Sequence, residues 1–173
     1  MSPPEAVAED PADGLLAIYD RAVPEVYGYL LPRCPNRTTA EDLTAETFLA
    51  AVSAVQRDAV PHMSVAWLVG VARHKLVDHW RRQSREDRKL RAVESEVVEE
   101  EDPWDRHLDA HRAHEVLGVL GPHHRAALTL RYLDALPVPE VAELLGRSTT
   151  ATEALLVRAK AAFRRAYDGG DDA

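Results

Sequence analysis

Apolar residues recur every three or four positions along most of the chain, which is the spacing of helices that bury one face. The pattern starts at Leu15 and predicts a first helix, although Pro24 and Gly28 weaken the expectation that it is uninterrupted. A turn is predicted at 32–37, PRCPNR. The apolar stripe of this first helix consists of Leu16, Tyr19, Val23, Val26, Tyr27, Leu30 and Leu31.

A second helix is predicted at 38–55, TTAEDLTAETFLAAVSAV, with Thr38 or Thr39 as its N-terminal cap and acidic residues in its first turns. Its polar side is either an ordinary solvated face or a docking surface for a basic partner. The residues expected to face the core are Leu43, Phe48, Leu49 and Val52, and those on the polar side are Glu41, Asp42 and Glu46.

A third helix is predicted from Val65 to about Val93, after a polar loop at 56–64. It interleaves apolar residues such as Trp67 and Trp80 with basic ones. Aromatic and basic residues on one helix suit single-stranded nucleic acid, whose bases stack and whose phosphates pair with cations. A buried tryptophan beside a solvated basic face explains the same pattern equally well.

The C-terminal part of the chain predicts four further helices. One covers 106–120 and stops at Gly121-Pro122, and another covers 123–133. The next two are short helices joined by a tight corner. Val138 to Leu145 has helical apolar spacing, and Gly146 stands where the helix must stop and φ can become positive.

The last helix begins among Ser148, Thr149 and Thr150, where Thr150 and Glu153 form a plausible capping box, and it ends near Tyr167. Small Ala142 allows the two helices around the corner to approach closely. This layout is that of a DNA-binding helix-turn-helix, whose second helix enters the major groove. An ordinary helical hairpin in a core is the alternative.

Charge divides the chain into separate parts. The formal net charge is −8, which disfavours a free-standing DNA-binding protein because phosphate attraction supplies most non-specific affinity. Residues 73–91 nevertheless carry eight basic against three acidic residues, and residues 93–105 carry seven acidic residues and no basic one. We predict an all-α chain of two small helical domains, at 15–92 and 109–167, joined by a flexible acidic linker at 93–108. Disordered tails are expected at 1–14 and 168–173.

Other chemistry has little support in the sequence. A single cysteine, Cys34, excludes an internal disulfide and suits a reducing cytoplasm, and no stretch approaches the roughly 20 apolar residues that span a bilayer. His107, His111 and His114 could share a helix face and suggest zinc, but no cysteine or HExxH pattern supports that reading. We therefore expect no metal, no cofactor and no catalytic residue.

The basic aromatic helix, the acidic linker and the terminal helix-turn-helix occur in a recognisable order. The chain resembles bacterial sigma factors of the extracytoplasmic-function (ECF) group of the sigma-70 family, which retain only regions two and four. AEDLTAETFLAAV resembles the helix that docks on the RNA polymerase clamp, and VAWLVGVARHKLVDHWRR resembles the helix that melts and reads the −10 element. The segment from Leu120 to Arg165 resembles region four, which reads the −35 element.

The resemblance implies three sets of contacts, with core RNA polymerase, duplex −35 DNA and the melted −10 non-template strand. It also implies a cytoplasmic bacterial protein held by an anti-sigma factor, without membrane insertion. His74 stands where the family commonly has Asn, Ala45 replaces a frequent Gln, and Glu153 stands where a basic residue is common. The implied residues are Asp42, Leu43 and Glu46 for the polymerase; His62, Arg73, His74, Lys75 and Arg81 for the −10 element; and Arg147, Ser148, Thr149, Thr150, Thr152, Glu153 and Arg158 for the −35 element.

Three other functions remain compatible with parts of the sequence. A dimeric helix-turn-helix regulator would act without core polymerase on a palindromic site. A histidine-dependent metalloenzyme would use residues 107–124, and a helical adaptor would contact no nucleic acid.

Overall fold

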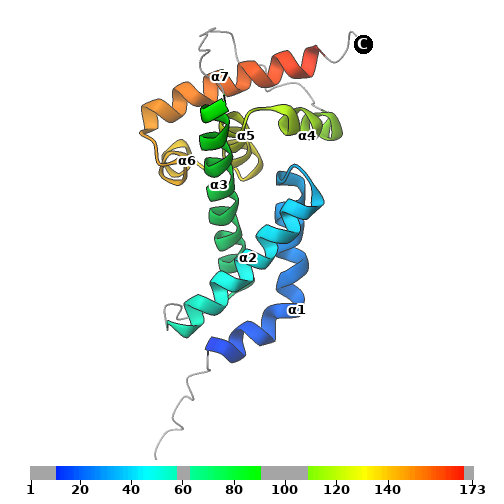
Figure 1. Cartoon of the computed structure of the whole chain (residues 1–173), viewed down its shortest axis with the longest axis vertical. Coiled ribbons are helices and arrows are strands. Elements are labelled where there is room, and N and C mark those ends of the chain that lie inside the picture. Colours follow the sequence, from blue (N-terminus) through cyan, green and yellow to red (C-terminus); the bar gives the residue numbers. More distant parts are fainter. Residues whose placement is uncertain (1–10, 58–62, 91–108, 170–173) are drawn as a thin grey trace, which may run out of the picture. The chain divides into compact units, whose positions relative to one another are not determined.

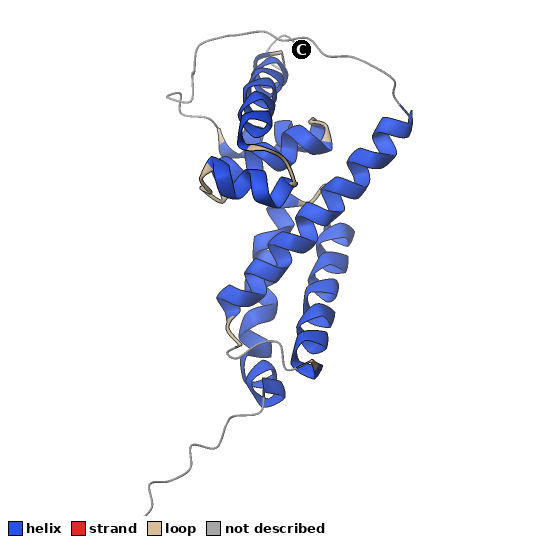
Figure 2. Cartoon of the chain, turned by 90° about the vertical axis from the view of Figure 1, so that its left-hand side faces the viewer, coloured by secondary structure: helices blue, strands red, loops and turns tan. Residues whose placement is uncertain are grey.

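A computed structural model describes residues 11–57, 63–90 and 109–169, with side chains omitted at 11–13 and 87–90. Within these ranges every regular element is helical, which confirms the predicted all-α fold (Figures 1 and 2). The chain forms two compact units, residues 1–76 and 77–173, and the boundary falls inside one long helix. The elements are α1 (Pro11–Leu30), η1 (Leu31–Arg33), α2 (Arg37–Gln56), α3 (Val65–Leu90), α4 (Ala110–Val119), α5 (Pro122–Leu128), η2 (Thr129–Leu133), α6 (Val138–Leu145) and α7 (Thr149–Asp168).

In the first unit, α1 and α2 pack against each other, and the chain reverses through η1. α1 begins at Pro11, four residues before the predicted start, and continues through Pro24 without a break. Asn36 caps α2, because its side-chain oxygen accepts a hydrogen bond from the Thr39 amide at 2.8 Å. The predicted threonine caps are therefore wrong by two or three residues, since the side chain of Asn36, which also caps helices well, was available before them.

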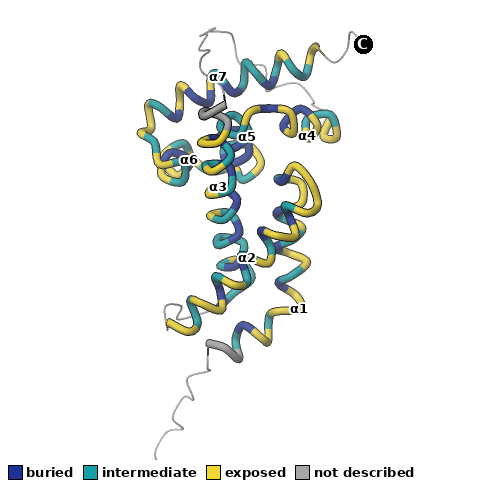
Figure 3. Tube along the Cα trace, in the orientation of Figure 1, coloured by how far each residue is buried: buried dark blue, intermediate teal, exposed yellow. Residues whose placement is uncertain are grey.

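α2 presents large apolar residues to the solvent. The residues that it buries are Ala40, Leu43, Thr47 and Ala51. By contrast, 66% of Leu49 and 42% of Val52 is exposed, so the expectation that both face the core is wrong. Buried and exposed stretches alternate along the trace of α2 (Figure 3). Phe48 is half-buried, and its ring meets the edge of Tyr19 on α1 with 5.1 Å between ring centroids. Leucine and valine side chains exposed together on one helix suit contact with another protein.

α3 is a single helix of 26 residues that contributes to both units. Its core positions repeat at helical spacing and include Leu68, Ala72, Leu76 and Trp80. Trp80 is only 1% exposed, so this ring is a core residue and does not present a stacking surface. The basic residues Arg73, Lys75 and Arg82 remain at least partly exposed on other sides of the helix. No helix among the described residues is long and apolar enough to cross a membrane.

The second unit contains α4 to α7, with α5 and α7 in the most extensive contact. One buried cluster joins α4, α5 and α7 around Leu117, Leu128 and Phe163. A smaller cluster joins Ala127 on α5 to Leu155 and Leu156 on α7. Arg125 binds the end of α4, where its Nε donates to the Leu117 carbonyl at 2.8 Å. The two clusters hold α7 through the face that carries Leu155, Leu156 and Phe163.

The corner between α6 and α7 has the predicted geometry. Gly146 adopts φ 63° and ψ 41°, in the left-handed region that glycine occupies at little cost. The Gly146 amide donates a hydrogen bond to the Glu143 carbonyl at 3.0 Å, and the Arg147 amide donates one to the Ala142 carbonyl at 2.9 Å. These two hydrogen bonds form a Schellman motif at the end of α6. Ser148 then caps α7, since its Oγ accepts from the Ala151 amide at 3.2 Å. The predicted Thr150–Glu153 capping box is therefore incorrect, because both residues already lie inside α7.

The helix predicted at 123–133 changes its winding partway. α5 ends at Leu128, and residues Thr129–Leu133 form a wider π-helical turn. Ala135 follows with φ 54°, the one positive-φ residue other than glycine among the described residues. The Arg131 guanidinium donates to the Leu136 carbonyl at 3.1 Å and closes this loop. The loop sets the path of the chain into α6.

Candidate functional site

Two of the three predicted polymerase-binding residues lie on the surface of α2. Asp42 is exposed and the side chain of Glu46 is 41% exposed. Leu43 is only 2% exposed, so its side chain lies in the core of the unit, and its contact with the polymerase stays a prediction. The Leu43 carbonyl accepts a hydrogen bond from the buried Thr47 hydroxyl at 2.7 Å, so this turn belongs to the core of the unit.

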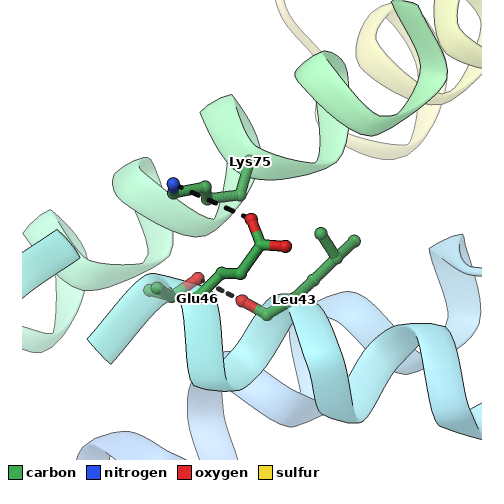
Figure 4. A network of polar contacts seen from close by, with 4 residues as sticks. Leu43, Glu46 and Lys75 are labelled. Atoms are coloured by element: carbon green, nitrogen blue, oxygen red, sulfur yellow. Dashed lines mark hydrogen bonds and ion pairs between the residues drawn. The ribbon is translucent and has the colours of Figure 1, made fainter. Parts of the chain in front are cut away.

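The start of α3 carries a basic surface beside α2. His74 is exposed, and Arg73 is half-buried with its guanidinium carbon 5.9 Å from the centre of the Tyr29 ring. Lys75 reaches across to α2, where its ammonium lies 3.8 Å from a carboxylate oxygen of Glu46 (Figure 4). A residue predicted for DNA is thus paired with a residue predicted for polymerase, which the sequence did not indicate.

The other two residues predicted for the −10 element are Arg81 and His62. The Arg81 guanidinium lies 3.9 Å from the Asp78 carboxylate one turn earlier, and 40% of the Arg81 side chain is exposed. His62 lies outside the described residues. Beside it along the chain, Met63 and Ser64 line a cavity of about 530 Å³ together with residues of α1. The α1 residues that line this cavity are Gly14, Ala17, Ile18, Arg21 and Glu25.

The start of α7 presents small polar side chains to the solvent. Thr149, Thr150 and Glu153 are exposed, and Ser148 is exposed although its hydroxyl caps the helix. Arg147 and Arg158 are half-buried.

Thr152 is fully buried and its hydroxyl donates to the Ser148 carbonyl at 3.0 Å, so it differs from its exposed neighbours, and its contact with DNA stays a prediction. Thr152 lies on the side of α7 that packs into the unit, three residues before buried Leu155.

His124 lies beside the positive charges of Arg158 and Arg165, an arrangement that the sequence did not indicate. This histidine lies on α5 and is partly buried. Burial lowers its pKa below the ordinary value of 6.5, and the charges of Arg158 and Arg165 on α7 lower it further. The three side chains therefore lie close enough to influence one another. The HHR triplet at 123–125 was visible in the sequence, but only the packing of α5 on α7 relates it to Arg158.

The histidines considered for zinc do not form a site in the described part of the chain. No group of three or more potential ligands occurs there. His111 is 85% exposed and lies 3.4 Å from the Glu115 carboxylate on the same helix. His107 falls outside the described residues.

Sequence profiles of known families match both halves of the chain. The profile of Sigma-70 region 2 matches residues 18–86, and the profile of Sigma-70 region 4 matches residues 110–163. A curated relative, the ECF RNA polymerase sigma factor SigC of Mycobacterium tuberculosis, is 30% identical over 126 residues, covering 72% of this chain and 68% of that protein. The chain belongs to the ECF sigma factors of the sigma-70 family. Members of this family act in transcription initiation by RNA polymerase and are not catalytic.

Other ECF relatives differ in how much of their length is matched. SigM of Bacillus subtilis is 29% identical over 164 residues, covering 88% of this chain and 94% of SigM. BldN of Streptomyces coelicolor is 33% identical over 156 residues, but the chain spans only 58% of BldN. The solved sigma factor RpoE of Bartonella quintana, in complex with the anti-sigma factor NepR, has the same fold, with a TM-score of 0.53 at 19% identity over 91% of this chain and 96% of that one.

Proposed function

We propose that this sigma factor binds core RNA polymerase through α2, recognises a duplex −35 element through α7 and opens the −10 element through α3. The observation that carries the proposal is the match to sigma regions 2 and 4, in that order along an all-helical chain. The sigma factor works in the bacterial cytoplasm, where the polymerase and its promoters are found. An anti-sigma factor that covers α2 and α7 keeps it inactive until a signal arrives.

For the −35 element, the exposed start of α7 supplies the base-reading surface. Thr149, Thr150 and Glu153 can reach base edges, and a glutamate can accept a hydrogen bond from the cytosine amino group. Arg147 flanks this surface. Arg158 and Arg165, which lie near each other around His124, form a positive cluster suited to the phosphate backbone, which positions the helix without reading sequence.

For the −10 element, α3 supplies Arg73, His74 and Lys75. The cavity of about 530 Å³ between α1 and residues 63–65 offers a place for an unstacked base, because Met63 supplies apolar contact and Glu25 and Arg21 supply hydrogen-bonding groups. Capture of an unstacked base offsets the few kcal/mol that unstacking costs. Opening of the duplex then needs no covalent chemistry from the sigma factor.

For the polymerase, the docking surface combines acidic and apolar residues of α2. Asp42 and Glu46 offer carboxylates to a basic partner, and exposed Leu49 and Val52 offer apolar area. A surface of this kind fits a protein partner better than DNA, whose phosphates would be repelled by the acids.

Run-off transcription with bacterial core polymerase on a library of genomic promoters tests this function. We expect transcripts that start at a small set of promoters sharing two elements, and that require the sigma factor. Equal transcription with and without the sigma factor, at every promoter, would overturn the proposal.

A further inference from the structure

The ion pair between Glu46 and Lys75 links two surfaces that have different proposed partners. Glu46 lies on α2, on the surface proposed for polymerase, and Lys75 lies on α3, on the surface proposed for the −10 strand (Figure 4). The ammonium nitrogen and the carboxylate oxygen are 3.8 Å apart. In the free protein each group is therefore the other's counter-ion.

Both side chains can change partner without disturbing the fold. The side chain of Lys75 is 33% exposed and that of Glu46 is 41% exposed, so a second macromolecule can reach either one. The backbone beneath them is held independently by buried neighbours, Leu43 and Thr47 on α2 and Ala72 and Leu76 on α3. Because these core residues fix the two helices, the ion pair can open by side-chain rotation alone.

The two proposed partners compete with this pair. A phosphate of the −10 strand needs the Lys75 ammonium, and a basic group on the polymerase needs the Glu46 carboxylate. Binding of either partner takes one member of the pair and leaves the other without its counter-ion. The second partner can then bind the remaining charged side chain without first breaking the ion pair.

We propose that the Glu46–Lys75 ion pair makes polymerase docking and −10 strand binding mutually reinforcing, because each partner releases the residue that the other one binds. This inference rests on the proposed function of α2 and α3. It gives Glu46 a second role, that of restraining a DNA-binding lysine until the polymerase is present. Since coupling between two binding sites is reciprocal, the same factor must appear in both affinities.

The expected size follows from the exposure of the pair. Partly exposed ion pairs contribute little, so each coupled affinity should change by about two- to fivefold.

A double-mutant cycle tests the proposal with the full-length chain. The variants are Glu46→Gln, Lys75→Gln and the double variant, and the DNA probe is a labelled single strand with the −10 sequence identified by run-off transcription. For the free protein, Glu46→Gln should tighten strand binding by about two- to fivefold in the wild-type background and leave it unchanged in the Lys75→Gln background. Once saturating core polymerase has engaged the docking surface, Glu46→Gln should not alter strand affinity.

The reciprocal measurement is the affinity of each variant for core polymerase in the absence of DNA. It can be made even if the free protein binds the strand weakly. Lys75→Gln should tighten core binding by about two- to fivefold, and only while Glu46 is present. Glu41→Gln is the matched control, since Glu41 is an exposed acid of α2 that makes no ion pair among the described residues. It should reproduce neither gain.

Two failures can be told apart. If Glu46→Gln and Glu41→Gln change strand affinity equally, or if the cycle is additive in both assays, ordinary charge repulsion accounts for the data and the coupling is overturned. If the wild-type complex with core polymerase binds no −10 strand at all, the proposed function fails instead.

Discussion

α2 and α7 are helices of equal length, 20 residues each, yet they distribute their large apolar side chains in opposite ways. α7 buries large residues, including Leu155, Leu156 and Phe163, and exposes threonines and a glutamate at its start. α2 buries mainly small residues and leaves Leu49 exposed. Small polar side chains suit contact with base edges and phosphates, whereas exposed apolar side chains suit contact with protein. The contrast indicates that the two helices serve different kinds of partner.

The largest effect should come from the buried face of α7. Phe163 is 5% exposed and packs with Leu117, Leu128 and Ala159. Phe163→Ala should lower the free energy of unfolding of the second unit by about 3–5 kcal/mol, because it removes buried contacts and leaves a cavity. Denaturant unfolding followed by circular dichroism measures this change. A loss below about 1 kcal/mol would show that α7 is not held by this face.

The exposed face of α2 should behave in the opposite way. Leu49→Ser should change the free energy of unfolding by no more than about 0.5 kcal/mol, since Leu49 is 66% exposed. Affinity for core polymerase should nevertheless fall by about tenfold, because an apolar contact is lost. Val119→Ser, at an apolar residue of α4 that is 76% exposed, is the matched control and should weaken core binding much less. Equal losses in the two variants would contradict a docking surface centred on α2.

Arg158 tests the DNA side of the comparison. Arg158→Ala should weaken −35 duplex binding by roughly fivefold and reduce the slope of log affinity against log salt by about 0.9, the value for one phosphate contact. Arg37→Ala, at an exposed arginine of α2, should leave both quantities nearly unchanged. A salt titration by fluorescence anisotropy measures the slope. An unaltered slope would remove Arg158 from the −35 contacts.

Ala135 offers a smaller, stabilising change. Its φ of 54° is unfavourable for a residue with a Cβ, and glycine adopts it freely. Ala135→Gly should therefore raise the free energy of unfolding by about 0.5–1 kcal/mol, with DNA and core affinities unchanged. Thermal unfolding detects the gain. A lower melting temperature would mean that the flexibility added to the unfolded chain outweighs the relief of strain.

The smallest effect concerns the pH dependence of stability. The pKa of His124 is lowered in the folded protein, first by burial and then by Arg158 and Arg165. The unfolded chain thus binds the proton more tightly than the folded protein does. Neutral His124 therefore favours the folded state fully above the unfolded pKa of about 6.5, and the free energy of unfolding decreases as the pH falls below that value. In His124→Gln, the drop in stability between about pH 7.5 and pH 5.5 should be smaller than in the wild type. An identical drop in both proteins would refute this assignment.

The features predicted best from sequence depend on local geometry. The α6–α7 corner followed from Gly146, because a short helix that ends at glycine has few alternatives. The cap of α7 was narrowed to three adjacent hydroxyl residues, and sequence alone could not select Ser148 among them.

The features predicted least well depend on packing between helices. α2 has apolar residues on more than one side, so periodicity did not reveal that Leu49 points outward. The burial of Thr152 and the cluster around His124 arise from contact between α7 and the rest of its unit, and the pairing of Lys75 with Glu46 arises from contact between α2 and α3. None of these contacts joins residues that share a sequence motif.

The division of labour between α2 and α7 is tested most directly by in vitro transcription on a mixture of promoters with varied −35 sequences. The wild type should be compared with Leu49→Ser and with the double variant Thr149→Ala, Thr150→Ala. We expect Leu49→Ser to raise the sigma concentration that gives half-maximal transcription without altering which promoters are used, and the double threonine variant to alter which promoters are used. If Leu49→Ser changes promoter choice, or if the threonine variant changes only the concentration required, the assignment of α2 to polymerase and α7 to DNA is contradicted.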